Sequence, residues 1–215
     1  MKKERVNKII KEACVESLDE AIAAESSGAD RIELCSRLDL DGLTPDEDLI
    51  KACLDKLKIP IKVMIRPRSG DFIYTTSELK EIYKSISLCK SHNISEIVFG
   101  AETINYDLDL HIISEIAVRA YPMPVTIHKV IDRVRNPILD ILKLKHFRNV
   151  KSILSSGQAN TATEGIENLL KMKAACANRF TLIAAGKITA QNIDELHSKL
   201  DLKEYHGKKI VTMNI

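Results

Sequence analysis

The chain has 215 residues, of which 45% are hydrophobic, and this is enough to bury the core of one large domain. Its 32 basic and 30 acidic residues leave a formal net charge of +2 without long blocks of one sign, which argues against nucleic acid and membrane surfaces as partners. No apolar run approaches the roughly 18 residues of a spanning helix, and no signal-peptide core follows the charged start, so we expect a cytoplasmic protein.

Short β-branched runs alternate with helical patterns along almost the whole chain, as in repeated β/α units. The predicted strands lie near residues 8–14, 29–35, 60–66, 94–100, 122–129, 150–155, 180–185 and 202–206. The predicted helices cover residues 17–27, 45–57, 77–92, 107–119, 136–145, 161–175 and 189–199. Seven helices therefore follow the first seven of eight strands.

Eight parallel strands with helical crossovers can close into a TIM barrel, whereas a doubly wound open sheet usually stops at about five to seven strands. We predict one TIM (β/α)8 barrel domain over residues 1–215. Only nine residues follow His206, so the final helix is expected to be missing or incomplete. A partner subunit would cover the apolar surface left between the first and last helices, and we therefore expect a homo-oligomer.

Charged side chains concentrate at the carboxyl ends of the predicted strands, where barrel enzymes build their sites. The first strand offers Glu12 and Cys14, and the second offers Arg31, Glu33 and Cys35. Each set occupies every second position, so its members share one face of the strand. The two glutamates and the arginine either form part of a site or neutralise one another inside the barrel.

Two further segments carry candidate site residues. Arg66 and Arg68 flank a proline after the third strand and present two guanidinium groups to an anion, unless contacts with Asp71 simply pin this loop. His128 ends the fifth strand, and Asp132 follows four residues later. Because the ordinary pKa of histidine lies near neutrality, His128 could transfer protons, although a structurally satisfied histidine is the alternative.

Three late turns, residues 155–158, 185–187 and 206–209, combine glycine with polar or basic residues. Barrels often bind phosphate with the loops after the last strands, so these turns are candidate anion sites. An ordinary tight turn followed by solvated lysines explains the pattern as well.

The five cysteines are odd in number, scattered along the chain and without a Cys-x-x-Cys pair, so we expect reduced thiols. Free cysteine is most often a buried, small apolar residue. If Cys14 and Cys35 both reach the rim of adjacent strands, however, their sulfur atoms could bind copper(I). Zinc would need two further ligands, and no histidine lies at a short spacing from either thiol.

A further pattern runs through residues 12–14, 28–35, 42–45, 65–74, 127–132 and 153–158. In their order and spacing these segments resemble the CutC family of copper homeostasis proteins, and the resemblance covers about residues 9–210. The resemblance implies a TIM barrel, a cytoplasmic location and a role in copper handling, with Cys14 and Cys35 as copper(I) ligands. Lys129 stands where the family has an arginine, which keeps the charge but loses the guanidinium fork.

We therefore predict a copper homeostasis protein of CutC type that binds copper(I). The alternative is an enzyme that acts by acid/base chemistry on a small anionic substrate, phosphorylated compounds included. For that alternative the predicted catalytic residues are Glu12, Glu33, His128 and Asp132. The predicted substrate-binding residues are Arg31, Arg66, Arg68, Asp71 and Lys129.

Overall fold

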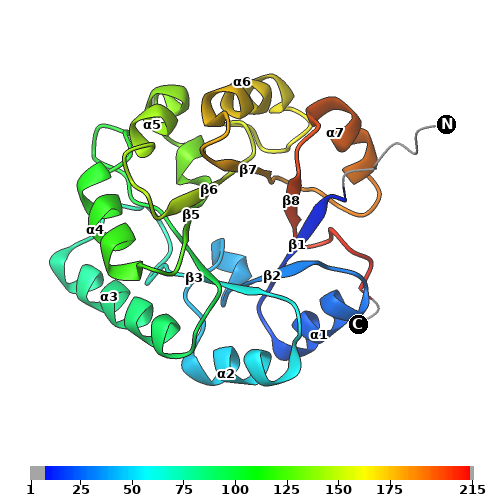
Figure 1. The fold of residues 1–215 in the computed structure, drawn as a ribbon, viewed down its shortest axis with the longest axis horizontal. Helices are drawn as coiled ribbons and strands as arrows, with labels where there is room; N and C mark the ends of the chain where they lie inside the picture. Colours follow the sequence, from blue (N-terminus) through cyan, green and yellow to red (C-terminus); the bar gives the residue numbers. More distant parts are fainter. Residues whose placement is uncertain (1–7, 214–215) are drawn as a thin grey trace.

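The computed structural model describes residues 8–213, which form a closed barrel of eight parallel strands inside a ring of seven α-helices (Figure 1). The strands follow one another around the barrel in chain order, and β1 pairs with β8 to close it. They are β1 (Ile10–Val15), β2 (Arg31–Leu34), β3 (Ile61–Met64), β4 (Glu96–Phe99), β5 (Val125–Ile127), β6 (Val150–Ser155), β7 (Thr181–Ala184) and β8 (Glu204–Gly207). The predicted TIM barrel is confirmed.

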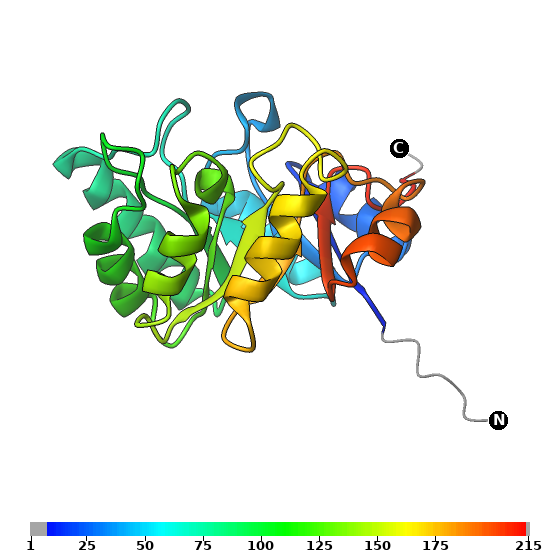
Figure 2. The ribbon, with the colours of Figure 1, turned by 90° about the horizontal axis from the view of Figure 1, so that it is seen from above.

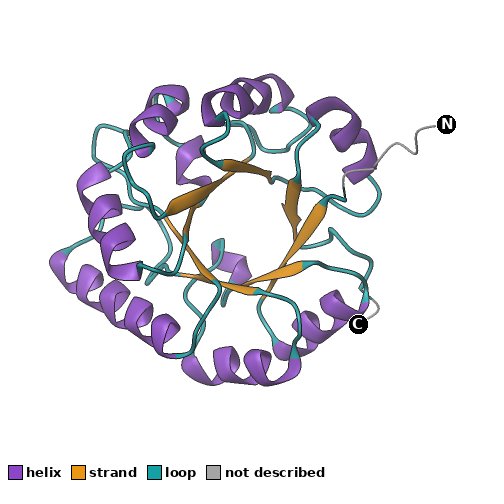
Figure 3. Cartoon of the chain, viewed as in Figure 1, coloured by secondary structure: helices purple, strands orange, loops and turns teal. Residues whose placement is uncertain are grey.

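The helices form the outer layer, and each connects one strand to the next (Figure 3). They are α1 (Leu18–Ser26), α2 (Glu47–Lys56), α3 (Thr76–Ser91), α4 (Leu110–Ala120), α5 (Pro137–Leu144), α6 (Ile166–Cys176) and α7 (Ile193–Leu200). Two 3-10 helices, η1 (Leu38–Leu40) and η2 (Lys129–Asp132), lie in the loops after β2 and β5. None of the described helices is both long and apolar enough to cross a membrane.

Five of the seven helices begin after a residue whose side chain caps them, whereas α6 and α7 begin without such a cap, and both begin later than predicted. At α3 the side chain of Thr75 accepts the Glu78 amide while the Glu78 carboxylate accepts the Thr75 amide, which is a complete capping box. Thr161 and Glu164 exchange the same two hydrogen bonds. There the chain makes only a turn, and α6 begins at Ile166, five residues later than the predicted start.

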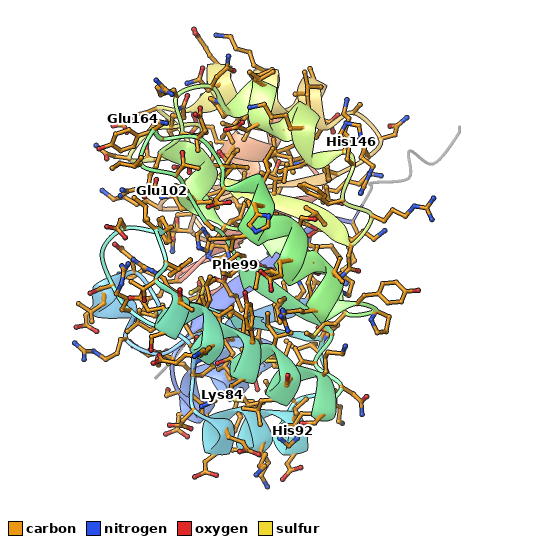
Figure 4. The ribbon with its side chains drawn as sticks, turned by 90° about the vertical axis from the view of Figure 1, so that its left-hand side faces the viewer. Lys84, His92, Phe99, Glu102, His146 and Glu164 are labelled. Atoms are coloured by element: carbon orange, nitrogen blue, oxygen red, sulfur yellow. The ribbon has the colours of Figure 1, made fainter. Side chains whose placement is uncertain are left out.

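The helices pack on the outward side chains of the strands, which form the main apolar core. Figure 4 shows the outer side built by α3 and α4, where Lys84 is exposed and Phe99 of β4 is buried. In Figure 2 the loops after β2, β3 and β6 rise above the barrel on the side of the strands' carboxyl ends. That side therefore has the longer loops from which a site can be built.

No helix follows β8 within the described residues, which agrees with the expected absence of an ordinary eighth helix. The outward side chains of Ala13 on β1 and Tyr205 on β8 are nevertheless fully buried. Ile210 and Val211, which follow β8, join the same core and cover this side of the barrel. The gap that suggested a partner subunit is thus filled from within the chain, and a homo-oligomer stays a prediction.

Candidate functional site

The carboxyl ends of the strands and the loops above them surround a cavity of about 580 Å³. Most of the residues predicted for the site line it: Cys14, Glu33, Cys35, Arg66, His128, Lys129 and Asp132. The other four, Glu12, Arg31, Arg68 and Asp71, lie outside its lining. The structure therefore separates residues that the sequence pattern placed together at one rim.

Glu12 and Arg31 belong to a layer of polar side chains inside the barrel, below the cavity. This ionic layer consists of Glu12, Arg31, Lys62, Glu96, Thr126 and Glu204. Arg31 donates to Glu12 and to Glu204, each at 2.5 Å. The Lys62 amine, which is fully buried, lies 3.3 Å from both Glu12 and Glu96 and donates to Thr126 at 2.9 Å.

The ionic layer neutralises its own charges. Burial alone would raise the pKa of Glu12, but Lys62, His206 and Arg31 together hold that pKa well below its usual range. Arg31, Glu96 and Glu204 are the first residues of their strands, so they lie at the amino end of the barrel. The guanidinium of Arg31 is therefore engaged by two carboxylates, and Arg31 does not line the cavity.

The two cysteines of β1 and the end of β2 form one side of the cavity floor. Cys14 Sγ and Cys35 Sγ lie 3.8 Å apart, and a carboxylate oxygen of Glu33 lies within 4.8 Å of both. The thiols pack with Met64 and Val98 in a small buried cluster. The hydrogen bond to Cys35 and burial raise the pKa of Cys14 well above its ordinary value. The floor thus combines soft sulfur atoms with one buried carboxylate.

His206 connects this floor to the ionic layer. Its Nδ1 lies 2.9 Å from Glu12 Oε1, and its Nε2 lies 3.4 Å from Glu33 Oε2. Burial alone would lower the pKa of His206, but Glu33 and hydrogen bonds to Cys14 and Glu12 raise it well above the ordinary value. Burial also raises the pKa of Glu33. The sequence placed His206 at the end of strand eight, but its role depends on the pairing of Glu12 with His206 across the barrel seam.

Arg66 follows β3, the strand that pairs with β2, and is 3% exposed. Its Nη1 donates to the carbonyls of residues 40–42 at 3.0 to 3.3 Å, and its Nη2 donates to the Gly70 carbonyl at 3.1 Å. These bonds tie together the loops after β2 and β3. The remaining donor, Nε, is buried and has no partner among the described residues.

His128 lies beside Arg66 and has a defined hydrogen-bonding state. Its Nδ1 accepts the Val130 amide at 3.1 Å, so the neutral ring carries its proton on Nε2. Nε2 is buried and also has no partner among the described residues. Burial lowers the pKa of His128 to about 3, which keeps the ring neutral near pH 7. A Cβ on Gly100 would lie 2.5 Å from the ring, so only glycine admits it.

Asp132 lines the cavity, but its carboxylate is fully used. It accepts hydrogen bonds from the Ser155 hydroxyl, from both the amide and the hydroxyl of Ser156, and from the Gln158 amide, at 2.5 to 3.0 Å. Asp132 therefore holds the loop of residues 155–158, whose Ser156 and Gln158 reach the cavity. This contact favours a positioning role for Asp132 over proton transfer.

Arg68 and Asp71 pin the loop after β3. Arg68 donates to the Asp71 carboxylate at 2.9 Å and to the Ile73 carbonyl at 2.8 Å, and it also pairs with Glu78.

The mouth of the cavity carries four exposed cations: Lys129, Arg133, Lys187 and Lys208. Arg133 was not foreseen, because its partner Glu102 lies 31 residues away in the sequence.

The closed β/α barrel makes this a TIM-barrel protein. Its polar cavity lies at the carboxyl ends of the strands, where such proteins bind small molecules or ions. The sequence pattern of the CutC family matches residues 9–211. The chain belongs to the CutC family, and the resemblance drawn from its motifs is confirmed.

Named relatives support this membership. A human protein called copper homeostasis protein cutC homolog is 34% identical over 202 residues, which cover 93% of this chain and 73% of that protein. The CutC family protein of Pasteurella multocida is 34% identical over 195 residues, 91% of this chain and 80% of its own. The crystal structure of the copper homeostasis protein CutC from Streptococcus agalactiae superposes with a TM-score of 0.89 at 27% identity, covering 94% of this chain and 100% of that one.

Proposed function

We propose that this protein serves copper homeostasis by binding copper(I) through Cys14 and Cys35. The observation that carries the proposal is the 3.8 Å separation of the two sulfur atoms at the floor of an open cavity. Two metal–thiolate bonds of about 2.3 Å can bridge such a span. Soft sulfur ligands favour copper(I), and the thioether of Met64 packs in the same cluster.

Anaerobic copper(I) titration against a competing chelator tests the proposal. The wild-type protein should bind one equivalent, and the double variant Cys14→Ser/Cys35→Ser should lose that binding. Cys53→Ser is the matched control, because Cys53 is equally buried but lies on α2, away from the cavity. Unchanged affinity in the double variant would contradict the proposed ligands.

A second candidate function is an enzyme that acts on a small anionic substrate. Arg66 Nε and His128 Nε2 are buried donors that have no partners within residues 8–213, and both residues line the cavity. Leaving such a donor unpaired costs about 1 to 3 kcal/mol, so an acceptor supplied by a ligand would offset that cost. Exposed cations at the mouth favour a negatively charged ligand, and Glu33 and His206, which line the same cavity, are the candidate proton-transfer groups.

Ligand-induced thermal stabilisation across a panel of carboxylates and phosphate esters tests this candidate. His128→Phe keeps a ring beside Gly100 but removes the Nε2 donor, so it should abolish the stabilisation produced by any compound that the wild-type protein binds. His92→Phe, at the end of α3 and remote from the cavity, is the matched control. Equal stabilisation of wild type and His128→Phe would refute this use of the donor.

We also propose that the protein is cytoplasmic. All five cysteines are free and buried, although two of them lie within 3.8 Å of each other. A reducing compartment preserves such thiols. Fractionation of cells that express the tagged protein, with the protein recovered outside the soluble cytoplasmic fraction, would contradict this location.

A further inference from the structure

We infer that Cys14, Cys35 and Glu33 form a site for a divalent zinc ion, with the fourth coordination position open to the cavity. This goes beyond the copper(I) proposal, because copper(I) needs only the two thiols and gains little from a carboxylate. The sequence alone argued against zinc, because zinc needs two ligands besides the thiols and no histidine lies at a short spacing from either cysteine. The barrel brings Glu33 of β2, the pairing partner of Cys14, close to both thiols.

The two sulfur atoms already lie at the distance that suits one tetrahedral ion, and the Glu33 carboxylate lies near both. One ligand atom from each of the three residues lies within 4.8 Å of the other two. Zinc–sulfur bonds of about 2.3 Å at the tetrahedral angle place two sulfur atoms about 3.8 Å apart, whereas a linear arrangement places them about 4.6 Å apart. The observed separation of Cys14 Sγ and Cys35 Sγ is 3.8 Å. The floor therefore matches tetrahedral coordination.

Glu33 supplies the independent observation that points to a cation. Its side chain is 2% exposed, and Oε2 faces His206 Nε2 at 3.4 Å. Its other oxygen, Oε1, is buried without a hydrogen-bond partner among the described residues. A buried carboxylate oxygen in that state is costly, and a metal ion beside the two sulfur atoms would satisfy it.

A chain of side chains behind Glu33 holds the carboxylate in place. Glu12 contacts His206 Nδ1 at 2.9 Å, and His206 Nε2 contacts Glu33. Arg31 and Lys62 in turn fix Glu12. Metal-binding carboxylates are commonly oriented by such outer contacts, whose loss typically lowers metal affinity about 10- to 100-fold. His206 and Glu12 are therefore positioning residues for the zinc site.

The open position would face the cavity that Arg66 and His128 also line. Zinc sites with three protein ligands keep one position for water or substrate and act as Lewis acids. Arg66 Nε and His128 Nε2 are buried donors without partners among the described residues. A zinc ion on the floor and an anion held by these two donors would share one chamber.

Competition titration of the reduced protein with zinc and with copper(I) separates the two metal proposals. Wild type should bind one equivalent of zinc, and Glu33→Gln should weaken zinc binding at least about tenfold while leaving copper(I) affinity unchanged. Cys14→Ser should weaken the binding of both zinc and copper(I). Glu96→Gln, a carboxylate substitution in the ionic layer, should change neither. Unchanged zinc affinity in Glu33→Gln, or no stoichiometric zinc binding by wild type, would overturn the inference whatever the copper(I) result.

Cobalt(II) substitution keeps the test decisive if Glu33→Gln fails to fold. Wild-type protein with one equivalent of cobalt(II) should show the intense visible bands of a tetrahedral site and a thiolate-to-metal charge-transfer band. Added zinc should bleach both. A weak octahedral spectrum, or charge transfer that disappears in the Cys53→Ser control, would overturn the assigned ligands.

Discussion

The inside of the barrel contains two polar regions that differ in how completely their charges are paired. In the ionic layer, Arg31 and Lys62 each contact two carboxylates, and the Thr126 hydroxyl lies between Lys62 and Glu96. In the cavity just above it, Glu33 Oε1, Arg66 Nε and His128 Nε2 are buried and have no partners in the part of the chain that the structure describes. Glutamate and arginine thus pair with each other in the ionic layer, whereas in the cavity they present polar atoms to which a ligand can bind.

This difference separates the polar groups that are available to a ligand from those that are not. A buried charge that is fully paired is costly to disturb but has nothing left to offer a ligand. A buried polar atom without a partner is a cost that natural proteins rarely keep without a use. Substitutions in the ionic layer should therefore lower the stability of the fold, whereas substitutions of the unpaired cavity residues should mainly weaken ligand binding.

The largest expected effect is the loss of the buried cation in the ionic layer. Lys62→Met should lower the free energy of unfolding by about 3 to 5 kcal/mol, because Glu12 and Glu96 would keep their charges without their shared partner. Urea unfolding measures the change, and Lys84→Met on exposed α3 should stay within about 0.5 kcal/mol. A loss below about 1 kcal/mol would mean that the layer does not depend on Lys62.

An intermediate effect should appear as pH dependence at the cavity wall. Burial lowers the pKa of His128 to about 3 from its ordinary value near 6.5, so between these values only the unfolded chain binds the proton. The contribution of His128 to the free energy of unfolding is fully present above about pH 6.5. Below that pH it falls by about 1.4 kcal/mol per pH unit until the pH approaches the pKa of the folded state. Unfolding free energies at pH 7, 6 and 5 should show a steeper loss for wild type than for His128→Phe. Parallel curves would contradict a buried neutral ring.

The smallest effect on stability is expected where the wild-type atom has no partner. Glu33→Gln changes a carboxylate whose Oε1 makes no hydrogen bond to the described residues, and His206 keeps its contact with Glu12, so the free energy of unfolding at pH 7 should stay within about 1 kcal/mol of wild type or rise. Thermal and urea unfolding of the metal-free protein measure this. A loss as large as that of Lys62→Met would remove the contrast between the two regions.

Much of the fold was predictable because it rests on local patterns. The alternation of Glu12 with Cys14, and of Arg31 with Glu33 and Cys35, correctly predicted that each set faces one side of its strand. It did not reveal that Glu12 and Arg31 lie one layer deeper than the cysteines, since depth depends on pairing between strands. In the barrel Glu12 pairs with Arg31, and Cys14 pairs with Glu33.

The sequence by itself determined the barrel, the candidate thiols and the basic loop after β3, because hydrophobic periodicity and turn residues act over short stretches of chain. Only the tertiary structure decided which polar groups are paired and which are free. His206 reaches Glu12 across 194 residues, and Arg31 reaches Glu204 across 173. Such contacts arise when the barrel closes and β1 pairs with β8, an arrangement that no local pattern encodes.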